Sequence, residues 1–283
     1  MKEINPFRVN IERLKPMKII KGGKSPTLNG TGYVFFDTSP IVEEFLATEV
    51  HPNKVLLELG AGYSNLTIKV LEKGVGSYTA NDISEAHLKI LVARLKEAFK
   101  DDLTQKLNSL KLLCGRAPQD LPSTHQLYDA IIMDKVLHFM PPDDILQFIR
   151  WAKLALKPKG RLYVTTATPY SKTFSPLLKE YLARSLRGDL FPGHFFNVMQ
   201  NISFQVREHQ TEYILPSEMV IFGSQDLSNL FEKKGMKIIR TYSLKRPEGE
   251  QMNWLDVTEE EGCIEEESCL AGVVVENKDV REP

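Results

Sequence analysis

The chain has 283 residues, a formal net charge of −1, and a composition that is 42% hydrophobic and 26% charged. This is typical of a globular protein with one large core, or with a core and a small appended lobe. A basic bias typical of nucleic-acid-binding domains is absent, and no apolar run reaches the roughly 18 residues of a membrane-spanning helix. The three cysteines are odd in number and lack zinc-ligand spacing, so we expect a reducing, cytoplasmic environment and no metal site.

The N-terminal part of the chain shows little periodicity. Residues 1–24 carry seven Lys or Arg against two Glu, whereas residues 256–283 carry ten Asp or Glu against two basic residues. One interpretation is that both ends are exposed to solvent. The alternative is that the basic arm contacts an acidic partner or the chain's own acidic tail. Residues 25–39 are rich in turn formers around Tyr33, and Pro40 is suited to begin a helix.

From residue 54 onward, apolar runs alternate with amphipathic stretches. The runs predict strands over residues 54–59, 77–82, 110–114, 128–133 and 161–167. The stretches between them predict helices over residues 64–73, 84–99 and 143–156. Strands that alternate with helices predict a parallel sheet covered on both faces, with right-handed crossovers.

A glycine turn follows the first of these strands. Gly60, Ala61 and Gly62 lie between the strand that ends near Glu58 and a helix, so backbone N–H groups can approach a ligand beside the positive helix end. Asp82 lies twenty residues after Gly62 at the end of the next strand, where an acidic residue can accept ribose hydroxyls. This spacing fits a dinucleotide or S-adenosylmethionine.

Two details favour S-adenosylmethionine. The dinucleotide fingerprint has a third glycine where this chain has Asn65, and Glu58 suits a cationic cofactor better than a pyrophosphate. The run Glu58-Leu59-Gly60-Ala61-Gly62 resembles the first motif of the class I S-adenosylmethionine-dependent methyltransferases. The run from Leu156 to Val164, with Lys157-Pro158-Lys159-Gly160, resembles the approach to that family's fifth strand.

The resemblance covers roughly residues 54–168 and 224–278. It implies an α/β, Rossmann-like doubly wound fold, with a seven-stranded, mostly parallel sheet and an antiparallel last strand. A helix from residue 224 or 226 to 234 and strands over 236–242 and 270–275 match the way this family ends.

These patterns divide the chain into four predicted parts. They are an N-terminal arm with a cofactor-covering segment (1–53), an S-adenosylmethionine-binding core (54–168), a substrate-binding lid insertion (169–223), and the C-terminal part of the core sheet with an acidic loop (224–283). The lid region is rich in proline and aromatic residues, and we expect a helix over 174–186.

The resemblance assigns roles around the glycine turn. Gly60, Ala61 and Gly62 would pass beneath the methionyl part of the cofactor, with Glu58 near its amino group. Asp82 would hold the ribose hydroxyls, and Ile83 would lie against the adenine. The alternatives are that Glu58 is a surface carboxylate and that Asp82 only leads the helix that begins at Ser84.

The following strands add further cofactor candidates. The family often has Gly-Asp-Ala where this chain has Gly115-Arg116-Ala117, and arginine offers no hydrogen-bond acceptor. The Arg116 side chain either stacks on the adenine or is exposed. The backbone groups of Gly115 and Ala117 would form hydrogen bonds with the edge of the adenine ring. Asp134 would face the methionyl end, and Tyr33 belongs to the segment expected to fold over the cofactor.

Two histidines are candidates for catalysis. His138 follows the fourth strand, where it either acts as a general base or packs beside the cofactor. His194 lies in the lid region among aromatic residues, and the alternative is a surface loop histidine.

The predicted function is therefore S-adenosylmethionine-dependent methyl transfer by in-line displacement to a small-molecule acceptor. A protein side chain is the alternative acceptor, and nucleic acid is not expected. The same patterns are compatible with a nicotinamide-dependent oxidoreductase and with a cofactor-binding protein that has no turnover. The sequence does not indicate an oligomeric state.

Overall fold

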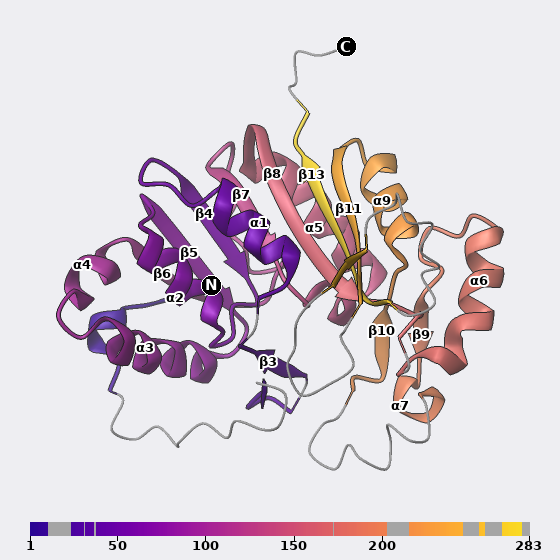
Figure 1. Cartoon of the computed structure of the whole chain (residues 1–283), viewed down its shortest axis with the longest axis horizontal. Coiled ribbons are helices and arrows are strands. Elements are labelled where there is room, and N and C mark those ends of the chain that lie inside the picture. The colour runs from indigo at the N-terminus through magenta and orange to yellow at the C-terminus, as the bar shows by residue number, and fades with distance from the viewer. Residues whose placement is uncertain are drawn as a thin grey trace.

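The computed structural model describes residues 1–10, 24–30, 32–36, 38–171, 173–202, 215–245, 255–257 and 268–278. A nine-stranded sheet forms its centre (Figure 1). In spatial order the strands are β1 (Lys2–Ile4), β6 (Leu110–Cys114), β5 (Ser77–Asp82), β4 (Val55–Leu59), β7 (Tyr128–Met133), β8 (Leu156–Ala167), β13 (Ser268–Glu276), β11 (Lys237–Lys245) and β12 (Leu255–Val257).

The five strands from β6 to β8 are parallel neighbours, and β13 lies antiparallel between β8 and β11. This arrangement confirms the predicted doubly wound α/β fold with an antiparallel last strand. All seven predicted strands are present. The sheet is nine strands wide because β1 and β12 add one antiparallel strand at each edge, and such short segments carry little periodicity by which to recognise them.

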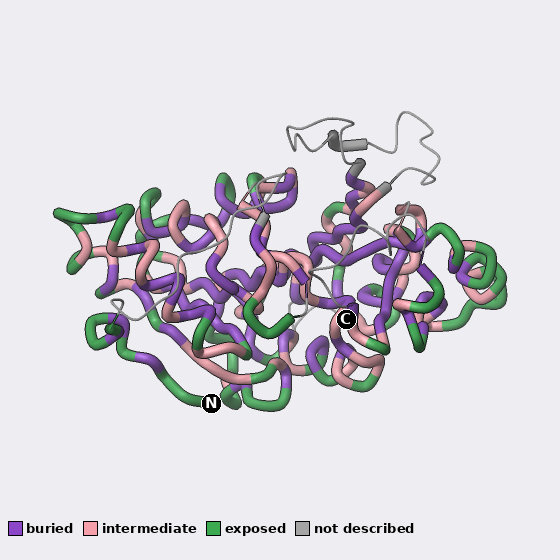
Figure 2. The backbone as a smooth tube through the Cα atoms, turned by 90° about the horizontal axis from the view of Figure 1, so that it is seen from below, coloured by how far each residue is buried: buried purple, intermediate pink, exposed green. Residues whose placement is uncertain are grey.

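Helices cover both faces of the sheet. One face carries α1 (Pro40–Thr48), α2 (Asn65–Lys73), α3 (Glu85–Phe99) and α4 (Leu103–Asn108), and the other carries α5 (Pro142–Ala155) and α9 (Ser224–Lys233). Successive residues of a strand face opposite layers. Leu56 therefore packs with the first group and Leu57 with the second, and both are almost fully buried. Buried residues run through the middle of the molecule (Figure 2).

Two of the predicted helices, α2 and α3, begin at a serine whose side chain caps the helix. The Ser64 hydroxyl accepts from the Leu66 N–H at 3.3 Å, and the Ser84 hydroxyl accepts from the His87 N–H at 3.3 Å. At the end of α5, strand β8 begins at residue 156, five residues before the predicted start at 161. The Asn277 side chain stabilises this junction by donating to the backbone oxygens of Lys153 and Leu156 at 2.9 and 3.2 Å.

The region after β8 forms a small unit beyond the end of the sheet (Figure 1). It comprises η3 (Ser175–Leu177), α6 (Leu178–Leu186), β9 (His194–Phe196), α7 (Val198–Asn201) and β10 (Glu218–Val220). The expected helix over 174–186 is thus present as η3 and α6. Tyr181 ties this unit to α9, because its hydroxyl donates to Asp226 and accepts from the Gly223 N–H at 2.7 Å.

A second small unit lies below the carboxyl ends of the parallel strands (Figure 1). Strands β2 (Lys24–Pro26) and β3 (Tyr33–Phe35) pair antiparallel as a hairpin. The short η1 (Pro6–Arg8) and η2 (Leu137–Phe139) complete the described elements. Most of the basic arm (11–23) and much of the acidic segment (258–267) lie outside the described residues. None of the helices described is both long and apolar enough to cross a membrane.

Candidate functional site

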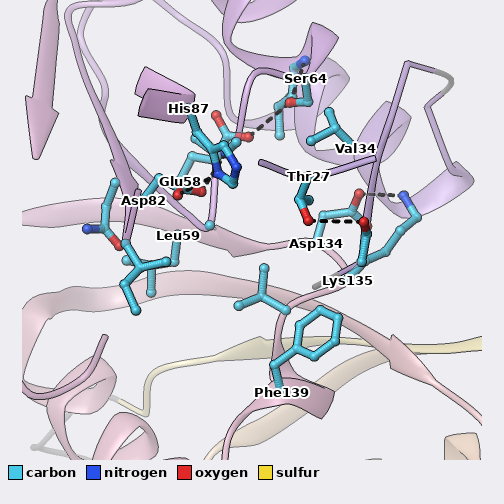
Figure 3. A pocket seen from close by; sticks show the side chains of 18 of the residues that line it. Thr27, Val34, Glu58, Leu59, Ser64, Asp82, His87, Asp134, Lys135 and Phe139 are labelled. Atoms are coloured by element: carbon cyan, nitrogen blue, oxygen red, sulfur yellow. Dashed lines mark hydrogen bonds and ion pairs between the residues drawn. The ribbon is translucent and has the colours of Figure 1, made fainter. Parts of the chain in front are cut away.

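A cavity of about 370 Å³ lies at the carboxyl ends of β4, β5, β6 and β7, with the β2–β3 hairpin on its far side (Figure 3). Every residue predicted to bind the cofactor lines it: Tyr33, Glu58, Gly60, Ala61, Gly62, Asp82, Ile83, Gly115, Arg116, Ala117 and Asp134. Its volume lies within the usual range for small-molecule sites. The location of all these residues around one cavity supports a role in cofactor binding, and the individual roles stay predictions.

The glycine turn forms one wall through its backbone. Gly60 has φ +71°, and a Cβ there would lie 2.3 Å from the Cγ2 of Val136. Gly62 has φ +54°, and a Cβ there would lie 3.1 Å from the Cγ2 of Val34 in the hairpin. The Ala61 N–H donates to the Asn81 oxygen at 2.8 Å, which fixes the turn against the end of β5. The positive φ angles favour glycine at both ends of the turn, and at Gly60 the contact with Val136 also leaves no space for a side chain.

The Asp82 carboxylate is buried and holds three backbone or side-chain donors. Its Oδ2 accepts from the Gly62 N–H at 2.8 Å. Its Oδ1 accepts from the Ser84 N–H at 2.8 Å and lies 3.0 Å from the Nδ1 of His87. Asp82 thus leads helix α3, as the alternative interpretation has it, and also lines the cavity.

Glu58 lies inside the protein, at 4% exposure, and is not the surface carboxylate of the alternative interpretation. Its Oε2 accepts from the Tyr78 hydroxyl at 2.6 Å and from the Thr67 hydroxyl at 2.7 Å. Burial raises the pKa of Glu58 to about 7, and the hydrogen bonds from Tyr78 and Thr67 oppose that rise. Its charge therefore depends on pH near neutrality.

A charged pair lies at the end of β7. The Asp134 carboxylate accepts from the Lys135 ammonium at 2.6 Å and from the Thr165 hydroxyl at 2.6 Å. Lys135 has φ +59°, and its N–H donates to the Thr165 hydroxyl oxygen at 2.8 Å. Its ammonium also lies 5.3 Å from the ring centre of Phe35 in the hairpin. Lys135 therefore links the sheet to the hairpin at this end of the cavity.

The residues expected near an adenine lie at the rim. Ile83 is 56% exposed although it lines the cavity. The Arg116 guanidinium pairs with Asp144 at 3.3 Å, and its side chain is about half exposed. Because Arg116 is partly exposed and also lines the cavity, both alternatives for its side chain stay open.

The two candidate catalytic histidines lie outside the cavity lining. His138 is buried, its Nδ1 accepts from the Ala167 N–H at 3.3 Å, and burial lowers its pKa to about 3. This arrangement keeps the imidazole neutral and favours a packing role over a general base. His194 lies in β9, where its Nε2 is 2.8 Å from Glu218, and it lines a second, separate cavity of the lid unit. A catalytic role for either residue remains an untested prediction.

Sequence reasoning did not identify several residues of the lining. His87 faces the cavity from the first turn of α3, and Lys135 adopts a left-handed backbone that lysine rarely adopts. Thr27 and Phe35 reach the site from the hairpin. Of these residues, only His87 could have been identified from the sequence. It lies five residues after Asp82 in the first turn of a helix, and such a side chain lies close to the end of the preceding strand. No group of three or more His, Cys, Asp or Glu side chains able to hold a metal occurs in the described ranges.

Comparisons with protein families and with solved structures both identify methyltransferases as similar to this chain. Residues 57–162 match the family described as a methyltransferase domain. Solved structures with similar folds include an S-adenosylmethionine-dependent methyltransferase from Methanosarcina mazei (TM-score 0.54, 17% identity, 86% of this chain and 99% of that one). Another is an S-adenosylmethionine-dependent methyltransferase from Mesorhizobium loti (TM-score 0.53, 14% identity, 84% and 96%). At these identities the likeness concerns the fold.

Two curated relatives are much longer than this chain. Prosolanapyrone synthase of Alternaria solani is 31% identical over 181 residues, which cover 58% of this chain and 6% of that protein. The highly reducing polyketide synthase PKS2 of Leptosphaeria maculans is 28% identical over 141 residues, which cover 47% and 5%. The similarity thus concerns a small part of each relative.

A matched pair of glycine substitutions tests the structure of the turn. Gly60→Ala should lower the free energy of unfolding by about 1–3 kcal/mol for the left-handed backbone and by a further 1–3 kcal/mol or so for the contact with Val136. Gly30, in the hairpin turn, has nearly the same φ of +72° with open space around it, so Gly30→Ala should show only the backbone cost. Urea unfolding of both variants measures the difference, and equal losses would contradict the tight packing at Gly60.

The pKa of Glu58 predicts a pH-dependent stability. Because its pKa rises from 4.5 to about 7 on folding, the folded state binds the proton more tightly, and stability falls as pH rises between these values. At about 1.4 kcal/mol per pKa unit, the loss above pH 7 is about 3 kcal/mol. Glu58→Gln should therefore gain stability relative to the native protein in urea unfolding at about pH 8 but not at about pH 4.5. If the difference in unfolding free energy between Glu58→Gln and the native protein did not change with pH, the interpretation of Glu58 as a buried carboxylate that ionises near pH 7 would be wrong.

Proposed function

Because this chain carries a domain of the class I S-adenosylmethionine-dependent methyltransferases, we propose that it transfers the methyl group of S-adenosylmethionine to a small-molecule acceptor. One observation carries the proposal most directly. The glycine turn, the Asp82 carboxylate and the end of β7 surround a single cavity that the β2–β3 hairpin covers.

The lining supports S-adenosylmethionine as the ligand. The turn from Gly60 to Gly62 lines the cavity with two residues that lack side chains, which suits a ligand lying against its backbone. Asp82 would accept from the ribose, Ile83 and the backbone near Gly115 would border the adenine, and Glu58 and Asp134 would lie towards the cationic methionyl end.

The chemistry requires alignment more than reactive side chains. When bound, the sulfonium of the cofactor supplies an activated methyl group that leaves by in-line displacement. The protein then has to bind and orient the cofactor, align the acceptor and exclude water. The hairpin is suited to exclude water, because Tyr33, Val34 and Phe35 face the cavity from the side opposite the strands.

Two observations support a small-molecule acceptor. Both curated relatives are named as synthases, one of prosolanapyrone and one of polyketides. In addition, the apolar cluster of the lid unit packs against Phe139, which lines the cavity, so the described part of the lid unit is suited to border the acceptor. The division of the chain into arm, core, lid and C-terminal sheet is part of this proposal.

We further propose a reducing, cytoplasmic setting. The odd cysteine count supports this setting, and Cys114 is a free thiol among the described residues. A protein side chain remains the alternative acceptor.

Calorimetric titration tests the cofactor. S-adenosylmethionine and S-adenosylhomocysteine should bind at micromolar concentration, and NAD(H) and NADP(H) should not. Asp82→Ala should weaken binding by about 1–3 kcal/mol, because it removes the proposed acceptor of the ribose hydroxyls. A folded Asp82→Ala variant that binds as the native protein does would refute that role, and preferential binding of a nicotinamide cofactor would refute the proposed function.

A further inference from the structure

The covering hairpin is tied to the cofactor-binding core by two buried rings. The Tyr63 hydroxyl donates to the Pro26 oxygen at 2.7 Å, just before the hairpin turn. The Leu28 N–H, within that turn, donates to the Nε2 of His87 at 3.0 Å. Tyr63 and His87 are 1% and 2% exposed, and their rings meet edge to face with centres 5.5 Å apart. The hairpin position is therefore set by groups inside the core.

The bond from Leu28 determines the protonation of the histidine ring. A backbone N–H can only donate, so Nε2 must accept, and the proton of a neutral imidazole lies on Nδ1. That nitrogen lies 3.0 Å from the Oδ1 of Asp82 and donates to it (Figure 3). One neutral ring thus satisfies both partners, one in the hairpin and one in the core.

The Asp82 carboxylate has little acceptor capacity left. Its Oδ1 accepts from the Ser84 N–H and from His87, and its Oδ2 accepts from the Gly62 N–H. A carboxylate offers about four lone-pair sites, so the remaining site is on Oδ2. The orientation of the carboxylate therefore decides where a ligand hydroxyl can bind.

We propose that His87 is a positioning residue that couples closure of the β2–β3 hairpin to the orientation of Asp82 towards the ribose. When the hairpin is closed, Leu28 holds the imidazole, and the imidazole holds Oδ1 so that Oδ2 faces the cavity. This inference rests on the proposed function, since it takes the ligand to be an adenosine-containing cofactor.

Analogues of S-adenosylhomocysteine that lack one ribose hydroxyl can show whether His87 orients Asp82 or only anchors the hairpin. One of the two analogues, 2′-deoxy or 3′-deoxy S-adenosylhomocysteine, lacks the hydroxyl that Asp82 holds. The native protein should bind S-adenosylhomocysteine at least about tenfold more tightly than that analogue, and this ratio of affinities is the preference that the variants test. His87→Phe keeps a ring of similar size but removes both hydrogen bonds. It should weaken binding of S-adenosylhomocysteine and reduce that preference to less than about threefold.

Tyr63→Phe is the matched control. It removes the hydrogen bonds of the Tyr63 hydroxyl to Pro26 and Ser25 in the hairpin but leaves Asp82 and His87 in place. It should therefore weaken binding of all three ligands by a similar factor and keep the preference. His87→Gln has an amide that can donate to Asp82 and accept from Leu28, so it should retain more of the preference than His87→Phe.

Titration calorimetry distinguishes the outcomes. An undiminished preference in His87→Phe would overturn the proposal, and so would equal loss of preference in Tyr63→Phe. A preference in His87→Gln as low as that in His87→Phe would also count against the coupling. If the native protein bound neither S-adenosylhomocysteine nor its analogues, the proposed function itself would fail.

Discussion

The site depends on the hydrogen bond from the Gly62 N–H to the Asp82 carboxylate, 2.8 Å long and buried. It joins the turn after β4 to the end of β5, and the Ala61 N–H adds a parallel bond to the Asn81 oxygen. Because the same carboxylate accepts from the Ser84 N–H, it also fixes the start of α3. A buried donor that lost this acceptor would remain unpaired, at a cost of about 1–3 kcal/mol. The glycine turn, two strand ends and two helix starts are therefore positioned together.

The acidic groups around the cavity are held in place by hydrogen bonds from neighbouring side chains. Glu58 accepts from Tyr78 and Thr67, and Asp134 accepts from Lys135 and Thr165. Side chains that are already fixed lose little conformational freedom on binding, which favours a site that aligns its ligands accurately. Methyl transfer from a sulfonium requires such alignment and little else from the protein. Neither candidate histidine lines the cavity, and a catalytic role for His138 or His194 stays a prediction.

The sequence predicted the parts of the site that depend on local pattern. Apolar runs located all seven main strands, and the glycine turn with Asp82 at its spacing located the cavity, because the carboxyl ends of parallel strands meet at one edge. The missed features depend on contacts between distant residues. His87 meets Leu28 across 59 positions, and Lys135 reaches Phe35 from a left-handed backbone position. Strands β1 and β12 are three residues each, too short for periodicity to identify.

The most direct test of the account is a crystal structure of the protein with S-adenosylhomocysteine. The account predicts that the ligand lies in the cavity beneath the β2–β3 hairpin, with its ribose on Asp82, its methionyl part along Gly60 to Gly62, and the bond between Leu28 and His87 intact. A ligand bound elsewhere, or one whose ribose does not contact Asp82, would contradict it.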